Sequence, residues 1–279
     1  MPIERSREPD AFTALEHEGW SRVIEDYQHL FGRLTQQAVE ATLDAAGVKA
    51  GDRLLDICTG HGILAAAAAS RGAIVRGLDF SEAVIAVARR KAPALVFDQG
   101  NAQELPYAAE SFDAVVCGFG IIHVPDPARG LAEIHRVLKP GGRTALSAWA
   151  RPAPTNGFGL LFGSVRTHGR TDVPLPHGPD MFQFGDEASM CAALADSDFH
   201  DVNAMTLPLI WAFERADGFL DTIMRAGVRG PALLKAQEKL AFTAIAAAIE
   251  EGVKSFAANG LFEVPMPAVI GSARKRRQN

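Results

Sequence analysis

The sequence predicts an α/β protein built on a doubly wound, mostly parallel sheet. Short apolar runs alternate with segments of helical periodicity, which is the pattern of repeated βαβ units. These runs lack polar alternation, as expected of strands that are buried on both faces. Strands are expected at residues 53–57, 74–78, 94–97, 114–117 and 144–148, and helices at 63–70, 82–91 and 128–138.

A glycine-containing turn follows the first predicted strand, in the segment Leu54-Leu55-Asp56-Ile57-Cys58-Thr59-Gly60-His61-Gly62. Glycines at such a turn let the backbone approach a ligand without a clash at Cβ. The next strand ends in a carboxylate, Asp79, which can accept both hydrogen bonds of a ribose diol. The two features together predict a site for a nucleoside cofactor.

Two classes of cofactor use this geometry. Gly60, Gly62 and Ala65 fit the G-x-G-x-x-G/A pattern of dinucleotide folds, which hold a pyrophosphate at a helix N-terminus. Asp56 lies four residues before Gly60, where its charge would repel a pyrophosphate but attract a cationic amino-acid group. The acid therefore favours S-adenosylmethionine over a nicotinamide dinucleotide.

Four segments in order resemble the motifs of class I S-adenosylmethionine-dependent methyltransferases. The segment 56–62 resembles the first motif, with Cys58 where a glycine is usual, and Gly100-Asn101-Ala102-Gln103-Glu104-Leu105-Pro106-Tyr107 resembles G-D-A-x-x-L-P-F. Residues 111–117 resemble the fourth strand, and 131–142, ending in Leu-Lys-Pro-Gly-Gly, resemble the helix and turn before the fifth. The resemblance is to the small-molecule branch that includes ubiquinone and menaquinone biosynthesis enzymes. It implies a seven-stranded Rossmann-like sheet whose last two strands are antiparallel.

Composition fits one enzyme-sized unit. The 279 residues are 48% hydrophobic, and the net charge of −5 gives no general attraction to nucleic acid. Cys58, Cys117 and Cys191 show no metal-ligand spacing, so we expect a reducing cytoplasm and no metal. No signal peptide is expected at Met1-Pro2-Ile3-Glu4-Arg5 and no membrane span elsewhere. The basic run 274–277 is expected to be a solvated tail.

Three parts of the chain are expected: an N-terminal helical segment (1–46), the cofactor-binding core (47–150), and a substrate-covering insert with the C-terminal strands (151–279). Residues 20–46 show a helical apolar stripe, which either packs on the core or forms a lid. In the resembling family such a segment often lies over the site. Tyr27 and Phe31 would then face the cofactor and acceptor, and Thr35 and Gln36 would reach the methionine end.

The last part is expected to begin as a Gly-, Pro- and Phe-rich insertion over residues 151–184. Asp186 is a candidate N-cap for a helix at 187–195. A strand is expected at 202–213, helices at 216–225 and 232–254, and a final strand at 262–272 that Pro265 and Pro267 would restrict to a sheet edge. The aromatic side chains of this part predict a small hydrophobic or aromatic acceptor: Phe158, Phe162, Phe182, Phe184, Trp211 and Phe213.

The resemblance assigns cofactor roles to individual residues. Asp79 would bind the ribose hydroxyls, unless it only caps the following helix, and Asp56 would orient the methionine amino group. Asn101 stands where the family commonly has Asp bonding the adenine amino group, and an amide oxygen can also accept that bond. The expected cofactor-binding residues are Tyr27, Asp56, Cys58, Gly60, Gly62, Asp79, Phe80, Asn101, Ala102, Gly118 and Phe119.

The best candidate for a catalytic base is His123, because it follows the end of the fourth strand by a few residues. A histidine that only bonds backbone is the alternative. His61 is expected to touch the cofactor, and His177 either reaches the pocket or lies in an exposed loop.

Two other functions compete with a small-molecule methyltransferase. A nicotinamide-dependent dehydrogenase would explain the glycine turn and Asp79 but not Asp56 or the later motifs. A non-catalytic S-adenosylmethionine-binding protein would keep every motif. A nucleic-acid methyltransferase is disfavoured, because the chain has no Asn-Pro-Pro-Tyr-type motif and no basic face.

Overall fold

The computed structural model describes residues 10–277, so residues 1–5, where no signal peptide is expected, lie outside the described range. A seven-stranded sheet has the order β3-β2-β1-β4-β5-β10-β6. The first five strands of this order pair in parallel, and β10 is antiparallel to both of its neighbours. The predicted doubly wound α/β fold is confirmed. The strands are β1 (Arg53–Ile57), β2 (Ile74–Asp79), β3 (Val96–Gln99), β4 (Phe112–Gly118), β5 (Leu138–Trp149), β6 (His200–Leu207) and β10 (Ala268–Arg274).

Helices cover both faces of this sheet. Leu54 and Val116 are buried on one face, whereas the next residue of each strand, Leu55 or Cys117, is buried on the other. Burial on both faces explains why the strand sequences are apolar throughout. On the Leu54 face lie α3 (Val39–Ala45), α4 (Ile63–Ser70) and α5 (Glu82–Lys91), and on the Leu55 face lie α6 (Pro127–Val137) and α8 (Glu187–Asp196).

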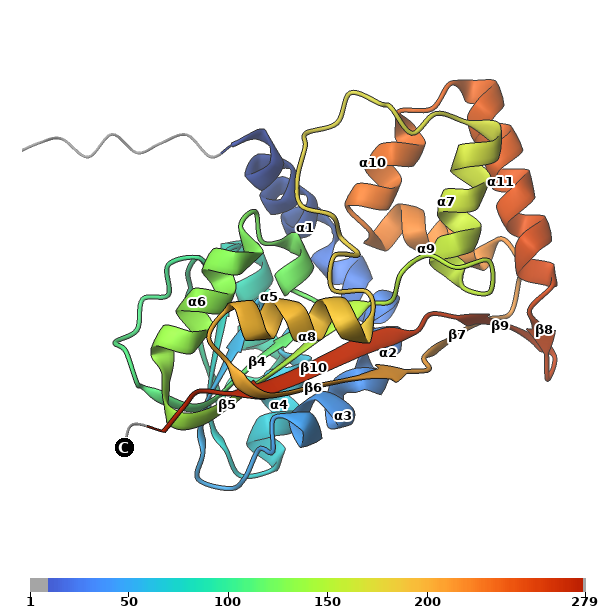
Figure 1. Cartoon of the computed structure of the whole chain (residues 1–279). Helices are drawn as coiled ribbons and strands as arrows, with labels where there is room; N and C mark the ends of the chain where they lie inside the picture. The colour runs from blue at the N-terminus through green and yellow to red at the C-terminus, as the bar shows by residue number, and fades with distance from the viewer. Residues whose placement is uncertain (1–9, 278–279) are drawn as a thin grey trace, which may run out of the picture.

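The N-terminal segment is helical, as predicted, but begins earlier than residue 20. Asp10 accepts a hydrogen bond from the backbone N–H of Thr13 at 2.8 Å and so caps α1 (Ala11–His29). After it come α2 (Phe31–Thr35) and a short 3₁₀ turn, Gln36–Ala38, that leads into α3. Figure 1 shows α1 between the core and a second group of helices, and it packs against α5 on one side and α9 (Gly218–Ala226) on the other.

That second group forms a cap over one end of the sheet (Figure 1). Two excursions of the chain build it, one between β5 and α8 and one between β6 and β10. Asp186 caps α8 through the N–H of Ser189, at 2.7 Å, as predicted. The cap contains α7 (Gly157–His168), α9, α10 (Arg229–Lys235), α11 (Lys239–Lys254) and a small sheet of β7 (Ile210–Phe213), β9 (Leu261–Pro265) and β8 (Ala257–Ala258).

Three predicted elements of this region are each divided in two. The expected strand 202–213 becomes β6 and β7, interrupted at Pro208, and 262–272 becomes β9 and β10. The expected helix 232–254 becomes α10 and α11. The edge position for the last strand was wrong, because β10 pairs on both sides. Pro267 precedes β10, so every residue of that strand keeps its N–H for the ladder.

The basic C-terminal run is only partly a solvated tail. The backbone N–H of Lys275 donates to Gly142 at 2.9 Å, and its ammonium donates to the carbonyl of Leu138 at 2.9 Å. Arg276 and Arg277 are exposed. Within residues 10–277, no helix combines the length and apolar character needed to span a bilayer.

Candidate active site

A cavity of about 370 Å³ lies at the carboxyl ends of the parallel strands. Strand order reverses at β1, which has β2 on one side and β4 on the other, and open α/β sheets bind ligands at such switch points. The core loops after β1, β2 and β4 form one wall of the cavity. The other walls come from α1, α2 and the cap, so all three parts of the chain meet at this site.

The turn after β1 explains why glycine is usual at the position of Cys58. Cys58 has a φ of 52°, in the left-handed region that glycine enters freely and other residues enter at a cost. Gly60 has a φ of +56°, and a Cβ added there would meet no atom within 4 Å, so its backbone is open to the cavity. Gly62 differs from Gly60. It does not line the cavity, and a Cβ there would lie 3.0 Å from the ring of Phe97.

Asp79 lies at the end of β2 and is 5% exposed. Its carboxylate accepts the N–H of Gly60 at 3.0 Å and the N–H of Ser81 at 3.2 Å, which joins the two core loops. Burial raises the pKa of Asp79 to about 6, against the backbone hydrogen bonds that favour the charged form. Each oxygen keeps further lone pairs for a ligand. Ser81, rather than Asp79, is the N-cap of α5, since its hydroxyl accepts the N–H of Val84.

Asp56 lies deeper, at 1% exposure, and lines the same cavity. Burial raises its pKa to about 7, although the hydroxyl of Thr59 donates to it at 2.6 Å. The hydrogen bond from Thr59 to Asp56 connects the end of β1 to the turn that follows it. Asp56 can therefore orient a cationic group only where it is ionised, that is, above about pH 7.

The residues expected near the adenine lie in the cavity wall. Phe80, Asn101, Ala102, Gly118 and Phe119 all line the cavity. The Oδ1 of Asn101 accepts the N–H of Gln103 at 2.9 Å, so that oxygen is already used within its own turn. Phe119 has a φ of 56° and stacks on Trp149, with ring centroids 4.1 Å apart.

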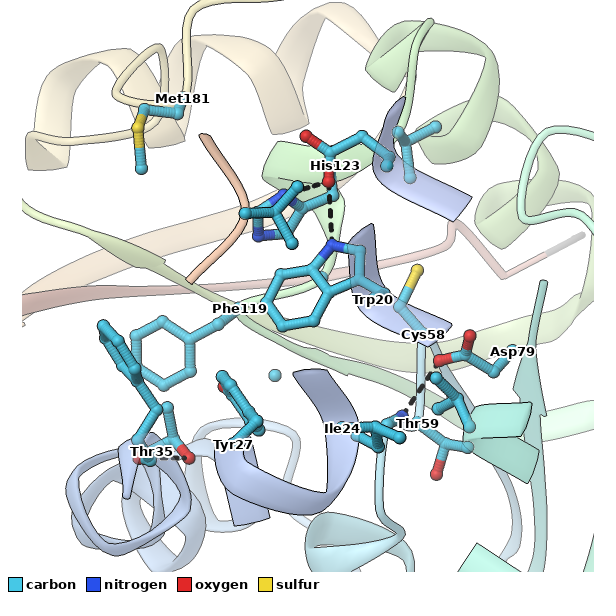
Figure 2. Close-up of a pocket in the computed structure, with 18 of the residues that line it drawn as sticks. Trp20, Ile24, Tyr27, Thr35, Cys58, Thr59, Asp79, Phe119, His123 and Met181 are labelled. Atoms are coloured by element: carbon cyan, nitrogen blue, oxygen red, sulfur yellow. Dashed lines mark hydrogen bonds and ion pairs between the residues drawn. The ribbon is translucent and has the colours of Figure 1, made fainter. Parts of the chain in front are cut away.

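The N-terminal helices contribute aromatic surface to the cavity. Tyr27 stacks on Phe31 with centroids 5.7 Å apart, and both line the cavity together with Thr35 (Figure 2). Burial raises the pKa of Tyr27 to about 12. The expectation for Gln36 was wrong, since it is exposed and outside the cavity wall.

The three histidines considered from the sequence differ in position. His123 ends the 3₁₀ turn η2 (Ile121–His123) and lines the cavity beside Trp20, with ring centroids 4.9 Å apart (Figure 2). His61 lines the cavity too, and burial lowers its pKa to about 4, which keeps the ring neutral. His177 is exposed and outside the cavity wall.

Only part of the aromatic set reaches the cavity. Phe158 and Phe162 of α7 line it, together with Met181. The other four pack elsewhere in the hydrophobic core: Phe182, Phe184, Trp211 and Phe213. Among the described residues, no group of three or more His, Cys, Asp or Glu side chains is arranged to hold a metal ion.

Sequence reasoning missed a buried ionic cluster on the α1 side of the cavity. Glu16 of α1 is 1% exposed and accepts from Arg229 Nε at 2.6 Å and from Trp20 Nε1 at 2.8 Å. Glu16 and Arg229 are 213 positions apart, so no local motif connects them. The available signal was a glutamate on the same helical face as Phe12 and Val23, which are both buried.

Comparison with known proteins gives a family for the core. Residues 55–146 match the family described as "Methyltransferase domain". This part of the chain is therefore similar to a methyltransferase domain. A curated relative, demethylmenaquinone methyltransferase of Beutenbergia cavernae, is 42% identical over 123 residues, which are 44% of this chain and 51% of that protein. The chain thus spans about half the length of this relative.

Solved structures extend the likeness of fold beyond the core. A structure titled as the [4+2]-cyclase SpnF has a TM-score of 0.62 at 19% identity and covers 97% of this chain and 98% of its own. Phosphoethanolamine N-methyltransferase 2 of Haemonchus contortus, solved with phosphomonomethylethanolamine and S-adenosylhomocysteine, has a TM-score of 0.59 at 20% identity, over 96% of this chain and 61% of that one. At such identities the likeness concerns the fold, because one fold hosts different chemistries.

Proposed function

We propose that the protein transfers a methyl group from S-adenosylmethionine to a small hydrophobic or aromatic acceptor. The observation that carries the proposal is the junction of Asp79 and the open Gly60 backbone at a strand-order reversal, facing an apolar cavity. Asp79 and the Gly60 backbone suit a ribose, and the apolar cavity suits a planar apolar molecule. The family match of the core supports the same activity.

S-Adenosylmethionine would lie along the core loops. Asp79 would accept the ribose hydroxyls, Asp56 would attract the amino group directly or through water, and Ala102 would donate its N–H to the adenine. Tyr27, Phe80 and Phe119 would cover the cofactor with aromatic surface. All six line the cavity. The opposed charges of the carboxylates and the amino-acid end would hold the cofactor in one orientation.

The acceptor would occupy the side of the cavity formed by α7, α9 and α10. Its wall is mostly apolar, with Phe158, Phe162, Met181 and Ile223 among its side chains. The curated relatives are named for demethylmenaquinone, and a quinone-like ring fits this wall in size and polarity. We propose that nucleic acid is not a substrate, because the net charge is −5. We also propose that the protein works in a reducing cytoplasm.

Methyl transfer needs alignment more than a catalytic group. The sulfonium is a good leaving group, so the protein must hold the acceptor in line with the methyl carbon and exclude water. His123 would remove a proton where the acceptor is acidic.

A panel of naphthalenes with one variable substituent tests the proposal. 1-Naphthol, 1-naphthylamine and 1-naphthalenethiol share one ring and differ in the acceptor atom, and phosphoethanolamine serves as the charged, non-aromatic comparison. Purified protein with methyl-labelled S-adenosylmethionine should label a naphthalene and leave phosphoethanolamine unlabelled. Failure to label any naphthalene, or labelling of phosphoethanolamine alone, would contradict the proposed acceptor class.

The two rival functions predict other outcomes. A dehydrogenase would bind NADH at this cavity, where Asp79 would suit its ribose but Asp56 would oppose its pyrophosphate. A non-catalytic binding protein would bind S-adenosylmethionine without turnover of any member of the panel.

A further inference from the structure

Glu16 is a buried carboxylate in the wall of the proposed acceptor site. Both of its oxygens are used: Oε1 accepts from Arg229 Nε at 2.6 Å, and Oε2 accepts from Trp20 Nε1 at 2.8 Å. The same Oε2 lies 3.0 Å from Nδ1 of His123. Figure 2 shows the ring of His123 next to the indole of Trp20 at the cavity. One carboxylate therefore connects α1, η2 and α10.

The contact between Glu16 and His123 is too poorly aligned to be a hydrogen bond at this orientation of the ring. The Nδ1–H does not point along the 3.0 Å line to Oε2, and Nδ1 is buried with no aligned partner among the described residues. Catalytic hydrogen bonds of unliganded enzymes are often misaligned in this way and tighten when the substrate binds. The other ring nitrogen, Nε2, makes no hydrogen bond with the described residues, and the side chain is 19% exposed and lines the cavity.

Arg229 keeps the carboxylate ionised and fixed in position. Burial alone would raise the pKa of Glu16, but His123 and Arg229 outweigh it and lower the pKa to about 2. The guanidinium also donates to the carbonyl of Ile122 at 2.9 Å and to that of Pro179 at 2.9 Å. Ile122 directly precedes His123, so Arg229 holds both the carboxylate and the backbone that carries the histidine.

We propose that Glu16 is a positioning residue that makes Nε2 of His123 the base for a hydroxyl on an aromatic acceptor. This inference rests on the proposed function and narrows its acceptor to an oxygen nucleophile. By accepting the Nδ1–H, Glu16 leaves the lone pair of the neutral imidazole on Nε2, toward the cavity. Nε2 takes the hydroxyl proton as the oxygen bonds to the methyl carbon. The C–S bond breaks with its electron pair on sulfur, so neutral S-adenosylhomocysteine leaves.

Glu16→Gln tests this assignment because it keeps the shape and removes the charge. Arg229, as the charged donor, would retain the amide oxygen, so the NH₂ group would replace Oε2, donate to Nδ1 and leave the indole N–H of Trp20 without its acceptor. The ring would then carry its proton on Nε2 and could not accept another. We expect long-range proton–nitrogen NMR of the full-length protein to show the Nδ1–H tautomer in the wild type and the Nε2–H tautomer in Glu16→Gln.

Kinetics with 1-naphthol give the second readout. We expect Glu16→Gln to lower kcat about a hundredfold, within the range for loss of a general base, with little change in KM or in affinity for S-adenosylhomocysteine. Glu18→Gln is the matched control: the same change on the same helix at an exposed position. It should alter neither readout.

A second variant covers the case in which Glu16→Gln does not fold, since it leaves Arg229 buried without its partner. Glu16→Gln/Arg229→Met removes both charges and should lose the Nδ1–H tautomer as well. An unchanged tautomer in either folded variant, or an unchanged kcat with 1-naphthol, would overturn the inference and leave Glu16 as a structural tie. Failure of the wild type to bind S-adenosylhomocysteine would instead overturn the proposed function, and the tautomer result would still stand by itself.

Discussion

The two sides of the cavity are built in different ways. The cofactor side comes from loops at the ends of β1, β2 and β4, and its key contact joins Gly60 to Asp79, nineteen positions apart. The proposed acceptor side joins α1 to α7, α9 and α10 of the cap, and its key contact joins Glu16 to Arg229, 213 positions apart. Short-range contacts leave a motif in the sequence, whereas long-range contacts between the N-terminal helix and the cap do not.

The chemistry of the two sides differs as well. The cofactor side offers carboxylates and backbone, which suit a polar ligand of constant structure. The acceptor side offers apolar and aromatic side chains with one ionic cluster at its margin. A substitution on one side should therefore change the affinity for one ligand and leave the affinity for the other unchanged.

Asp79→Ala should have the largest effect. It removes the acceptor of two expected ribose hydrogen bonds, each worth about 1.5 to 3 kcal/mol to a charged group, and it also frees the N–H groups of Gly60 and Ser81. Affinity for S-adenosylhomocysteine, measured by calorimetry, should fall at least tenfold. Affinity for 1-naphthol, measured by fluorescence without cofactor, should stay within a factor of about two. Equal losses of affinity for S-adenosylhomocysteine and 1-naphthol would show that the two sides of the cavity do not act independently.

Cofactor affinity should also fall in acid. The pKa of Asp79 is raised to about 6 and that of Asp56 to about 7, so both carboxylates gain protons as the pH falls through these values. A protonated carboxyl no longer accepts as an anion, hence affinity for S-adenosylhomocysteine should be highest above pH 7. It should fall by at least about tenfold between pH 8 and pH 5, because pH 5 lies one unit below the pKa of Asp79 and two units below that of Asp56, and each unit corresponds to a factor of about ten.

Asp79→Asn is the control for this pH dependence. It keeps the side-chain shape without the titration, so the loss centred near pH 6 should vanish while any loss near pH 7 from Asp56 remains. An affinity that rises toward pH 5 would contradict the ionised roles of both residues.

Phe162→Ala should affect the acceptor side alone. Phe162 lines the cavity and packs edge-on against Phe182, with centroids 5.6 Å apart. Loss of an aromatic contact costs about 0.5 to 1.5 kcal/mol, so KM for 1-naphthol should rise about threefold to tenfold. The matched control is Phe213→Ala, which removes a ring outside the cavity wall and should leave KM unchanged. A larger change in the affinity for S-adenosylhomocysteine than in the KM for 1-naphthol would place Phe162 on the cofactor side of the cavity and contradict the proposal.

Cys58→Gly should have the smallest effect. The left-handed backbone of Cys58 costs about 1 to 2 kcal/mol relative to glycine, but glycine loses about 0.5 to 1 kcal/mol more in ordering the chain. Denaturant unfolding should therefore show a free energy of unfolding within about 1 kcal/mol of the wild type. Affinity for S-adenosylhomocysteine should change less than threefold, and a tenfold loss would indicate that the thiol itself contacts the cofactor.

Sequence reasoning recovered the core because its signals are local. β1, α4 and α5 have the predicted bounds, and the strands pair as a doubly wound sheet. It failed where prolines and contacts from distant segments divide the elements, as in β9 and β10, where Pro265 and Pro267 precede the final strand rather than interrupt it. Gly62 shows a second limit of sequence reasoning. The motif identifies the glycine, but it does not reveal that a Cβ at this position would approach the ring of Phe97.

Calorimetric titration of the purified protein with S-adenosylhomocysteine and, separately, with NADH would decide which cofactor the cavity binds. The cofactor side as described predicts binding of S-adenosylhomocysteine at a stoichiometry of one per chain and no detectable heat from NADH. Asp56 is the reason, because its charge attracts the amino group of the first ligand and opposes the pyrophosphate of the second, whereas Asp79 suits the ribose of either. Binding of NADH without binding of S-adenosylhomocysteine would contradict the account and favour a dehydrogenase.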